Sequence, residues 1–397
     1  MANWIPWLLG GFAFFTPFSI AGAHLCLGAA TLLLLLDREA RSFAARLGRT
    51  HFLAVPVYLW IAVCVLSVLF AEDRAHSAEK LNKLALLVLL PLAALPQSRR
   101  ALRPLLSALL ISATIISAIG ITIHLLHGGG LEARNRGAGG FYMTVAGIAM
   151  MVALLTLAEI LAAFKDPRPR RLIFLGACFV LTSVALLATY TRGSWIGFAA
   201  GALLLLRRHR TALLAFGVGA VLFAIWGPPE ARDRLTSIVR PDDPHNVERV
   251  LIWKRGLELI QRDPLTGTGL WIPPEDMAGG EMNTPSGVLH VHSHMHSTPL
   301  QIAVTMGIPG LIVFIILIVA YFRLAKRARS AELRNLWEEG LVAAYPAILV
   351  ALLVNGLFEW NFGDSEVLGL FEFLTGAVLG IEAAKTTPPK AGDILSR

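Results

Sequence analysis

Long apolar runs separated by short polar segments make up most of the chain. Residues 52–70 and 104–126, for example, contain no Asp, Glu, Lys or Arg. Each run matches the roughly 20 apolar residues that an α-helix needs to cross about 30 Å of hydrocarbon. The pattern therefore predicts an all-α polytopic membrane protein with about 12 transmembrane helices.

The expected spans differ in length, and the second and eighth are short enough to be tilted, broken or re-entrant. The first begins close to Met1 with no basic segment before it and no small-residue cleavage site, so we expect a retained helix. The spans are roughly residues 3–22, 24–36, 52–70, 81–95, 104–126, 138–164, 172–190, 193–206, 211–226, 298–322, 340–358 and 366–383.

One long polar segment, residues 227–297, interrupts the pattern between the ninth and tenth spans. It predicts three parts: helices 1–9 in residues 1–226, a loop domain carrying catalytic residues in 227–297, and helices 10–12 with a tail in 298–397. A loop this long rarely lacks regular structure, so we expect a helical cap with a cleft beneath it. Residues 247–260 show an apolar stripe near helical spacing, made of Val250, Leu251, Trp253, Leu257 and Ile260.

The basic residues follow the loops unevenly and predict an orientation. Of the 35 Lys and Arg residues, 22 fall in alternate loops and the tail, and seven of the others lie in segment 227–297. Because Lys and Arg favour cytoplasmic loops, both termini should be cytoplasmic and the long loop should face outward. The net charge of +8 therefore reflects membrane topology, with some basic residues in contact with membrane lipids, and no nucleic-acid partner is expected.

Cys26, Cys64 and Cys178 lie in apolar spans, which predicts neither disulfides nor a zinc site.

Arginines gather on the side that should face outward. Arg192 stands between two apolar spans, where a guanidinium is costly unless it has a partner. Guanidinium groups bind phosphate in bidentate fashion, so an anionic lipid headgroup would suit this face. Pairing with Asp233, Asp242, Asp243 or Glu248 on a solvated face is the alternative. The loop arginines are Arg232, Arg234, Arg240, Arg249, Arg255 and Arg262.

Four histidines occupy every second position near the end of the long loop: His290, His292, His294 and His296. On a strand, this spacing would place the four rings on one face, where they could hold zinc or nickel. Structural zinc sites commonly include cysteine, and this loop has none. We therefore expect one catalytic histidine with idle neighbours and no metal, although an absence of any chemistry stays open.

Three stretches together resemble a known family: residues 191–195 (TRGSW), 248–271 (ERVLIWKRGLELIQRDPLTGTGLW) and 296–311 (HSTPLQIAVTMGIPGL). Their order, spacing and shared side resemble the O-antigen ligase family, within the wider ligase and polymerase group that has a long periplasmic loop. The likeness covers residues 188–200 and 245–312. The family usually has Asn after the loop histidine, whereas this chain has Ser297.

The resemblance implies an enzyme of the bacterial inner membrane that needs neither metal nor cofactor. Such ligases move a glycan from undecaprenyl pyrophosphate to a sugar hydroxyl of lipid A-core at the periplasmic face. Arg192 and Arg249, with Arg255 as a weaker candidate, would bind the pyrophosphate. His296 or His294 would take the proton of the acceptor hydroxyl, and direct attack would invert the anomeric centre.

Related and unrelated functions remain as alternatives. An O-antigen polymerase or a ligase that glycosylates pilin or another protein would use a similar donor. A secondary transporter is the alternative from a different class, and Glu159 or Glu372 inside the spans could then mark a cation route. A transporter predicts an internal repeat between the two halves, and none is evident.

Overall fold

The computed structural model describes residues 2–138, 140–274, 276–277, 281–284, 287–290 and 294–384. Five helices there are long and apolar enough to cross a membrane, or up to seven if each of two sharply bent pairs is one span. The chain is thus a multi-pass helical membrane protein, and the count of 12 spans stays a prediction. The five are α8 (Leu102–Leu126), α9 (Tyr142–Ala163), α10 (Pro169–Ala188), α15 (Thr298–Ala328) and α16 (Leu336–Gly356).

The bent pairs and shorter helices complete the bundle. The expected span 81–95 is a 3₁₀ segment followed by a short α-helix, and the expected span 24–36 begins earlier and ends in a bend of 95°. The remaining elements are η1 (Ala2–Trp4), α1 (Ile5–Phe15), α2 (Ile20–Leu36), α3 (Arg38–Thr50), α4 (Ala54–Phe70), α5 (Arg74–Glu79), η2 (Lys80–Val88), α6 (Leu89–Ala94), α7 (Pro96–Arg100), α11 (Arg192–Leu206), α12 (Arg210–Trp226), α13 (Pro229–Thr236), η3 (Ser237–Val239), α14 (Pro244–Arg262), β1 (Glu281–Thr284), β2 (Gly287–His290), η5 (Asn361–Gly363) and α17 (Ser365–Ala383).

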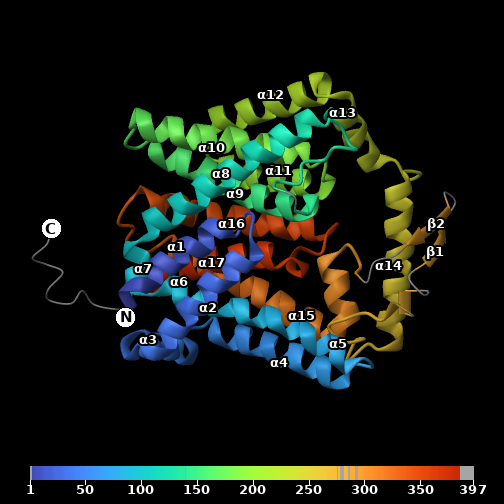
Figure 1. Cartoon of the computed structure of the whole chain (residues 1–397), viewed down its shortest axis with the longest axis horizontal. Coiled ribbons are helices and arrows are strands. Elements are labelled where there is room, and N and C mark those ends of the chain that lie inside the picture. The colour runs from blue at the N-terminus through green and yellow to red at the C-terminus, as the bar shows by residue number, and fades with distance from the viewer. Residues whose placement is uncertain are drawn as a thin grey trace, which may run out of the picture.

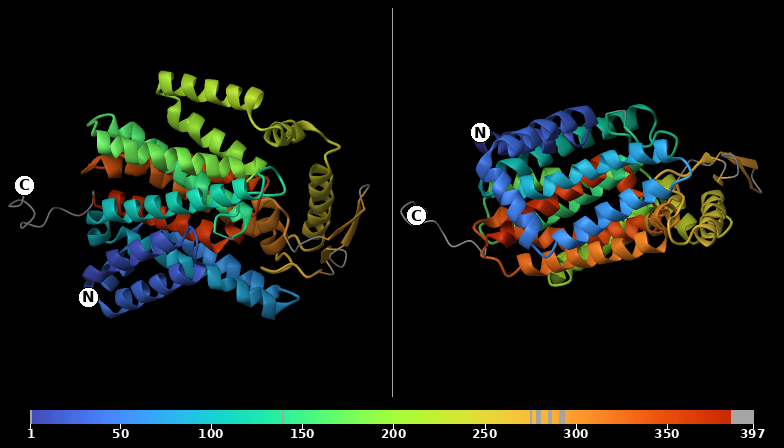
Figure 2. Two further views of the ribbon diagram at one scale, coloured as in Figure 1. Left: turned by 45° about the horizontal axis from the view of Figure 1, so that its top comes forward. Right: turned by 90° about the horizontal axis from the view of Figure 1, so that it is seen from below.

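The helices run roughly side by side, and α14 crosses one end of them (Figure 1). The antiparallel hairpin of β1 and β2 lies at that same end, as Figure 2 shows from two further directions. Helices α3 and α7, which carry two of the basic segments assigned to the cytoplasm, lie at the opposite end (Figure 1). The arrangement agrees with an outward long loop, and the membrane side itself remains a prediction.

Helix α11 packs closely against α16 because its facing positions are glycines. A Cβ atom at Gly193 would lie 2.6 Å from Asn355 Oδ1, and one at Gly197 would lie 2.6 Å from the carbonyl oxygen of Ala351. Ser194 Oγ donates to Asn355 Oδ1 at 3.3 Å. Gly193, Ser194 and Gly197 therefore serve close helix packing.

A break in α15 explains two of the sequence motifs. Gly307 has φ 67° and ψ −174°, and Pro309 has no N–H to donate to the carbonyl of Thr305. The segment containing Gly267 and Gly269 fills the gap, since Thr268 N donates to Val304 O at 2.9 Å and Gly269 N to Thr305 O at 3.1 Å. A Cβ atom at Gly267, which has φ 66°, would lie 2.4 Å from the Thr305 carbonyl carbon. The Gly-Thr-Gly turn and the broken helix are thus one packed unit.

Glu159 and Glu372, two of the acidic residues in the expected spans, have partners inside the protein. Glu159 is fully buried, and its Oε2 accepts from Arg171 Nη2 at 3.0 Å. The structure thus places Glu159 in an ion pair between α9 and α10. Glu372 Oε1 accepts from Tyr321 Oη at 3.0 Å. The three cysteines are free thiols, as predicted.

Candidate functional site

Helix α14 is the helix predicted within the long loop, but its buried face differs from the predicted stripe. Ile252, Gly256 and Leu259 are buried, and Trp253 and Ile260 pack beside them. Val250 and Leu257 were predicted on this face and are instead 48% and 55% exposed. The difference arises because α14 packs on one narrow side only, where Gly256 allows Met295 to approach.

Two side chains hold the short segment that carries His294 and His296. The backbone N–H of Met295 donates to Gln301 Oε1 at 2.7 Å, and its carbonyl accepts from Trp253 Nε1 at 3.0 Å. Met295 itself is fully buried. Trp253 on α14 and Gln301 on α15 therefore fix the backbone between the two histidines, which accounts for both residues in the motifs.

The histidines do not lie along one strand. Strand β2 ends at His290, whereas His294 and His296 lie in bends before α15, and His292 falls outside the described residues. The rings of His294 and His296 meet edge to face with centroids 4.1 Å apart. His296 has φ 44°, in the left-handed region that residues other than glycine rarely adopt. Such a conformation persists where its surroundings enforce it, which is common at functional sites.

Glu359, in the segment between α16 and η5, is the residue that the sequence analysis missed. Its Oε1 lies 3.4 Å from His296 Nδ1, and the residue is 9% exposed. Thr298 Oγ1 donates to the Glu359 carbonyl at 2.9 Å and ties this segment to the start of α15. Burial alone would raise the pKa of the Glu359 carboxyl, but contact with His296 and the charges of His296, His294 and Arg249 outweigh burial and lower that pKa. Glu359 is therefore a carboxylate at neutral pH.

Arg192 and Arg249 approach this site from different helices. Arg192, 7% exposed at the start of α11, donates to Ser237 Oγ at 2.8 Å and Asn246 Oδ1 at 3.0 Å, and pairs with Asp243 at 3.4 Å. It thereby joins the bundle to η3 and α14, and has the partners that its position requires.

Arg249 is half-buried, and within the described part of the chain its guanidinium has no hydrogen-bond or ion-pair partner. Burial lowers its pKa most; the charge of Glu359 opposes that effect and the charge of Arg192 adds to it. An arginine stays charged under such a shift. Arg249 therefore presents an available cation beside Glu359.

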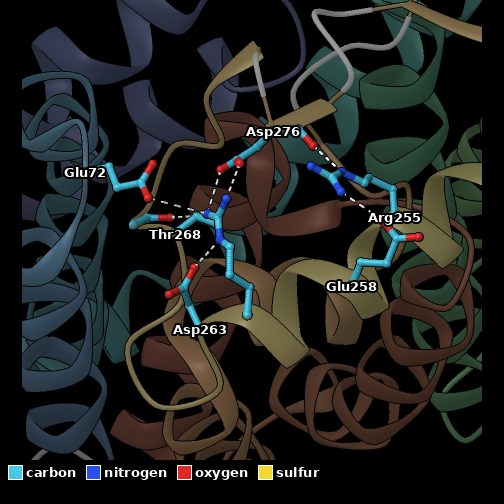
Figure 3. A network of polar contacts seen from close by, with 8 residues as sticks. Glu72, Arg255, Glu258, Asp263, Thr268 and Asp276 are labelled. Atoms are coloured by element: carbon cyan, nitrogen blue, oxygen red, sulfur yellow. Dashed lines mark hydrogen bonds and ion pairs between the residues drawn. The ribbon is translucent and has the colours of Figure 1, made fainter.

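Arg255 lies elsewhere on α14 and is engaged by other groups. Figure 3 shows it beside Asp276 and Glu258, with Nε donating to the Asp276 carbonyl at 2.5 Å and Nη1 to Glu258 Oε2 at 2.8 Å. Six residues at 100° each separate Arg255 from Arg249, so the two point from different faces of the helix. The structure does not place Arg255 with Arg192 and Arg249, and its binding of pyrophosphate stays a prediction.

An elongated apolar cavity of about 310 Å³ opens beside the histidines. His294, Gln301 and Glu359 line it near α14, and it follows α15 as far as Tyr321. By helical rise this stretch of α15 covers roughly 30 Å. Most of its depth is lined by α4, η2, α15 and α17 through apolar side chains such as Trp60, Leu84, Leu87, Phe314, Leu317 and Phe371.

His294, His296 and Glu359 could also hold a metal ion, because one ligand atom from each lies within 4.8 Å of the others. Two imidazoles and one carboxylate are a donor set found in catalytic zinc sites. The same three groups suit proton transfer, in which a carboxylate orients an imidazole base. The geometry of these three residues permits both metal binding and proton transfer, which differ in whether the reaction needs a metal ion.

The fold and site define a multi-pass membrane protein in which His294, Gln301 and Glu359 line a largely apolar cavity. Residues 177–315 match a family model described as O-antigen ligase. The chain therefore carries a domain of the O-antigen ligase family, whose members are glycosyltransferase-like enzymes, and the family resemblance of the three motifs is confirmed. No curated protein matches the chain. Ser194, His294, His296 and Arg249 fall inside the match, whereas Glu359 lies outside it.

Proposed function

We propose that this protein is an O-antigen ligase, which transfers a glycan from undecaprenyl pyrophosphate to a sugar hydroxyl of lipid A-core during lipopolysaccharide synthesis. The observation that carries the proposal is the His296–Glu359 pair, placed beside Arg249, with Glu359 lining a long apolar cavity. A donor whose lipid chain is joined to the reacting sugar through a diphosphate needs these three features together. The site would face the periplasm of the inner membrane, with both termini in the cytoplasm.

The donor already carries its leaving group, so its activation is electrostatic. Breaking the bond between the anomeric carbon and the diphosphate oxygen leaves more negative charge on the diphosphate than before. Arginines fixed before the reaction stabilise that charge, and such stabilisation is often the largest single catalytic effect. Arg249 has a guanidinium available for this purpose, Arg192 is held rigidly near it, and Arg255 is the weaker candidate.

The acceptor is an alcohol and gains from a base. His296 is favoured over His294 because the Glu359 carboxylate lies beside its Nδ1, which leaves Nε2 for the acceptor proton. As the proton moves to His296, the acceptor oxygen bonds to the anomeric carbon and the diphosphate departs from the opposite side. A single displacement inverts the anomeric centre and requires no metal ion.

Replacing Glu359 by glutamine should lower kcat roughly tenfold to a hundredfold, since the imidazolium formed during transfer loses its carboxylate partner. The depressed pKa of Glu359 keeps its charge present from neutral pH down to below the ordinary range of glutamate. Without that charge the imidazolium formed during transfer is less stable, so kcat should fall at every pH at which Glu359 is ionised. Glu359→Asp should restore part of the rate. An unchanged kcat in Glu359→Gln would remove Glu359 from the mechanism.

A chelator should leave the activity of the purified protein intact, whereas added Zn²⁺ should inhibit by occupying His294, His296 and Glu359. The check is the initial rate of transfer with EDTA, with Zn²⁺, and with EDTA added after Zn²⁺. Strong inhibition by EDTA that Zn²⁺ reverses would show a metal-dependent reaction and contradict the proposal.

Lipopolysaccharide from a strain lacking this protein tests the proposed reaction. A ligase predicts uncapped core with carrier-linked polymer accumulating in the membrane. A core carrying a single repeat unit would identify a polymerase instead. Unchanged lipopolysaccharide together with an unglycosylated pilin would identify a protein ligase, and unchanged glycans with altered solute uptake would favour a transporter.

A further inference from the structure

Two arginines that the site has not yet used are Arg134 and Arg234, and the charges of Arg134 and Arg192 both act on Arg234. Arg234, in the last turn of α13, is half-buried, and its Nε is buried with no hydrogen-bond partner among the residues that the structure describes. Arg134, in the loop between α8 and α9, is half-buried with its guanidinium carbon 4.5 Å from the centre of the Tyr142 ring. Both come from segments outside the predicted spans, at the same end as α14 (Figure 1).

Hydrogen bonds fix these segments against one another. Ser237 Oγ accepts from Arg192 and itself donates to the carbonyl oxygen of Arg234 at 2.9 Å. Asn246 accepts from Arg192 and donates to the carbonyl oxygen of Ser237 at 2.9 Å. Ser237 therefore holds both the carbonyl of Arg234 and the Arg192 side chain, and Asn246 fixes the backbone of Ser237, so Arg234 and Arg192 are kept close.

In this group the four arginines outnumber Asp243 and Glu359, the carboxylates whose charges oppose them. Burial, and then the charges of Arg134 and Arg192, lower the pKa of Arg234 to about 10. Asp243 is the carboxylate that opposes them, and it is paired with Arg192 at 3.4 Å. In the described part of the chain, the guanidiniums of Arg134, Arg234 and Arg249 have no ion-pair or hydrogen-bond partner. Half-buried guanidiniums held together in this way suit a multiply charged anion.

We propose that Arg134 and Arg234 complete a four-arginine site with Arg192 and Arg249, and that these two residues make the protein select a diphosphate over a monophosphate lipid. A diphosphate offers two phosphoryl groups, each able to accept bidentate hydrogen bonds, so it engages more guanidiniums than a monophosphate can. The inference rests on the proposed function for the identity of the donor, but it concerns binding and can be tested without glycan transfer.

Binding of farnesyl diphosphate and farnesyl monophosphate to the purified full-length protein in lipid nanodiscs tests the inference. The unaltered protein should bind the diphosphate at least about tenfold more tightly. Arg234→Gln and Arg134→Gln should each weaken diphosphate binding about tenfold, the effect of losing one charge-assisted contact, and should leave monophosphate binding nearly unchanged. Arg232→Gln is the matched control, because Arg232 is exposed on the same helix and, among the described residues, donates only to the Ile225 carbonyl at 3.3 Å.

Each result of the binding measurements either supports or contradicts the four-arginine site. Equal affinities of the unaltered protein for the two probes, or diphosphate binding unaffected by both substitutions, would overturn the inference. If Arg234→Gln lowers thermal stability, Arg234→Lys, which keeps the charge but loses bidentate geometry, should fold and still lose most of the selectivity; retained selectivity in that variant counts against the inference. Selective diphosphate binding without any transfer to lipid A-core would uphold the inference and refute the ligase proposal.

Discussion

Replacing His296 by alanine is expected to lower kcat for glycan transfer about 10²- to 10⁴-fold, the usual contribution of a general base. KM should change little, because the imidazole acts on the acceptor proton during the displacement. The readout is the initial rate of capped lipid A-core formation by the purified protein.

His294→Ala separates the two histidines that the sequence ranks together. The Glu359 carboxylate lies at Nδ1 of His296, so the account expects the smaller loss for His294. His127→Ala, at an exposed position beyond α8, is the control and should retain full activity. Farnesyl diphosphate binding should survive in His296→Ala, which would show an intact fold. The reverse order of effects would make His294 the base.

Replacing Arg249 by alanine should lower kcat about 10²- to 10³-fold, as expected when a fixed electrostatic partner of the leaving group is lost. Arg249 combines half-burial, proximity to Glu359 and a guanidinium without a partner among the described residues. The factor by which kcat falls should exceed the factor by which donor affinity falls, since negative charge on the diphosphate grows during the reaction.

Arg255→Ala is the comparison on the same helix. Its guanidinium bonds to Asp276 and Glu258, so the structure favours a change of less than about threefold in kcat. If Arg255 binds pyrophosphate, as the sequence predicted, its replacement should be as harmful as that of Arg249. Equal effects of the two substitutions would therefore show that α14 reorients when the donor binds.

Local patterns predicted the parts of the site that lie close together in sequence. The helical spacing of apolar residues predicted α14, and the three motifs predicted the family that residues 177–315 match. The buried face of α14 was partly wrong because apolar spacing cannot show that one narrow side packs while Val250 and Leu257 face outward. Periodicity also did not indicate that the segment at Gly267 packs against the break in α15 at Gly307. This packing depends on backbone contacts between segments distant in the sequence.

Residues brought in from distant segments could not be predicted. Glu359 follows an apolar helix in a segment without a motif, and only the fold places it against His296. Arg134 and Arg234 look like ordinary loop arginines, and their lack of anions appears only when their neighbours are known. The signal that could have drawn notice to Glu359 is a charged residue directly after an expected span on the outward side.

Transfer in a fully reconstituted system tests the central claim most directly. The purified protein in nanodiscs, given undecaprenyl-pyrophosphate-linked glycan and lipid A-core, should form capped lipid A-core with inverted anomeric configuration and release undecaprenyl pyrophosphate. His296→Ala and Arg249→Ala should each bring the rate near background. Undiminished turnover by Arg249→Ala, or a product with retained configuration, would contradict an arginine-stabilised single displacement.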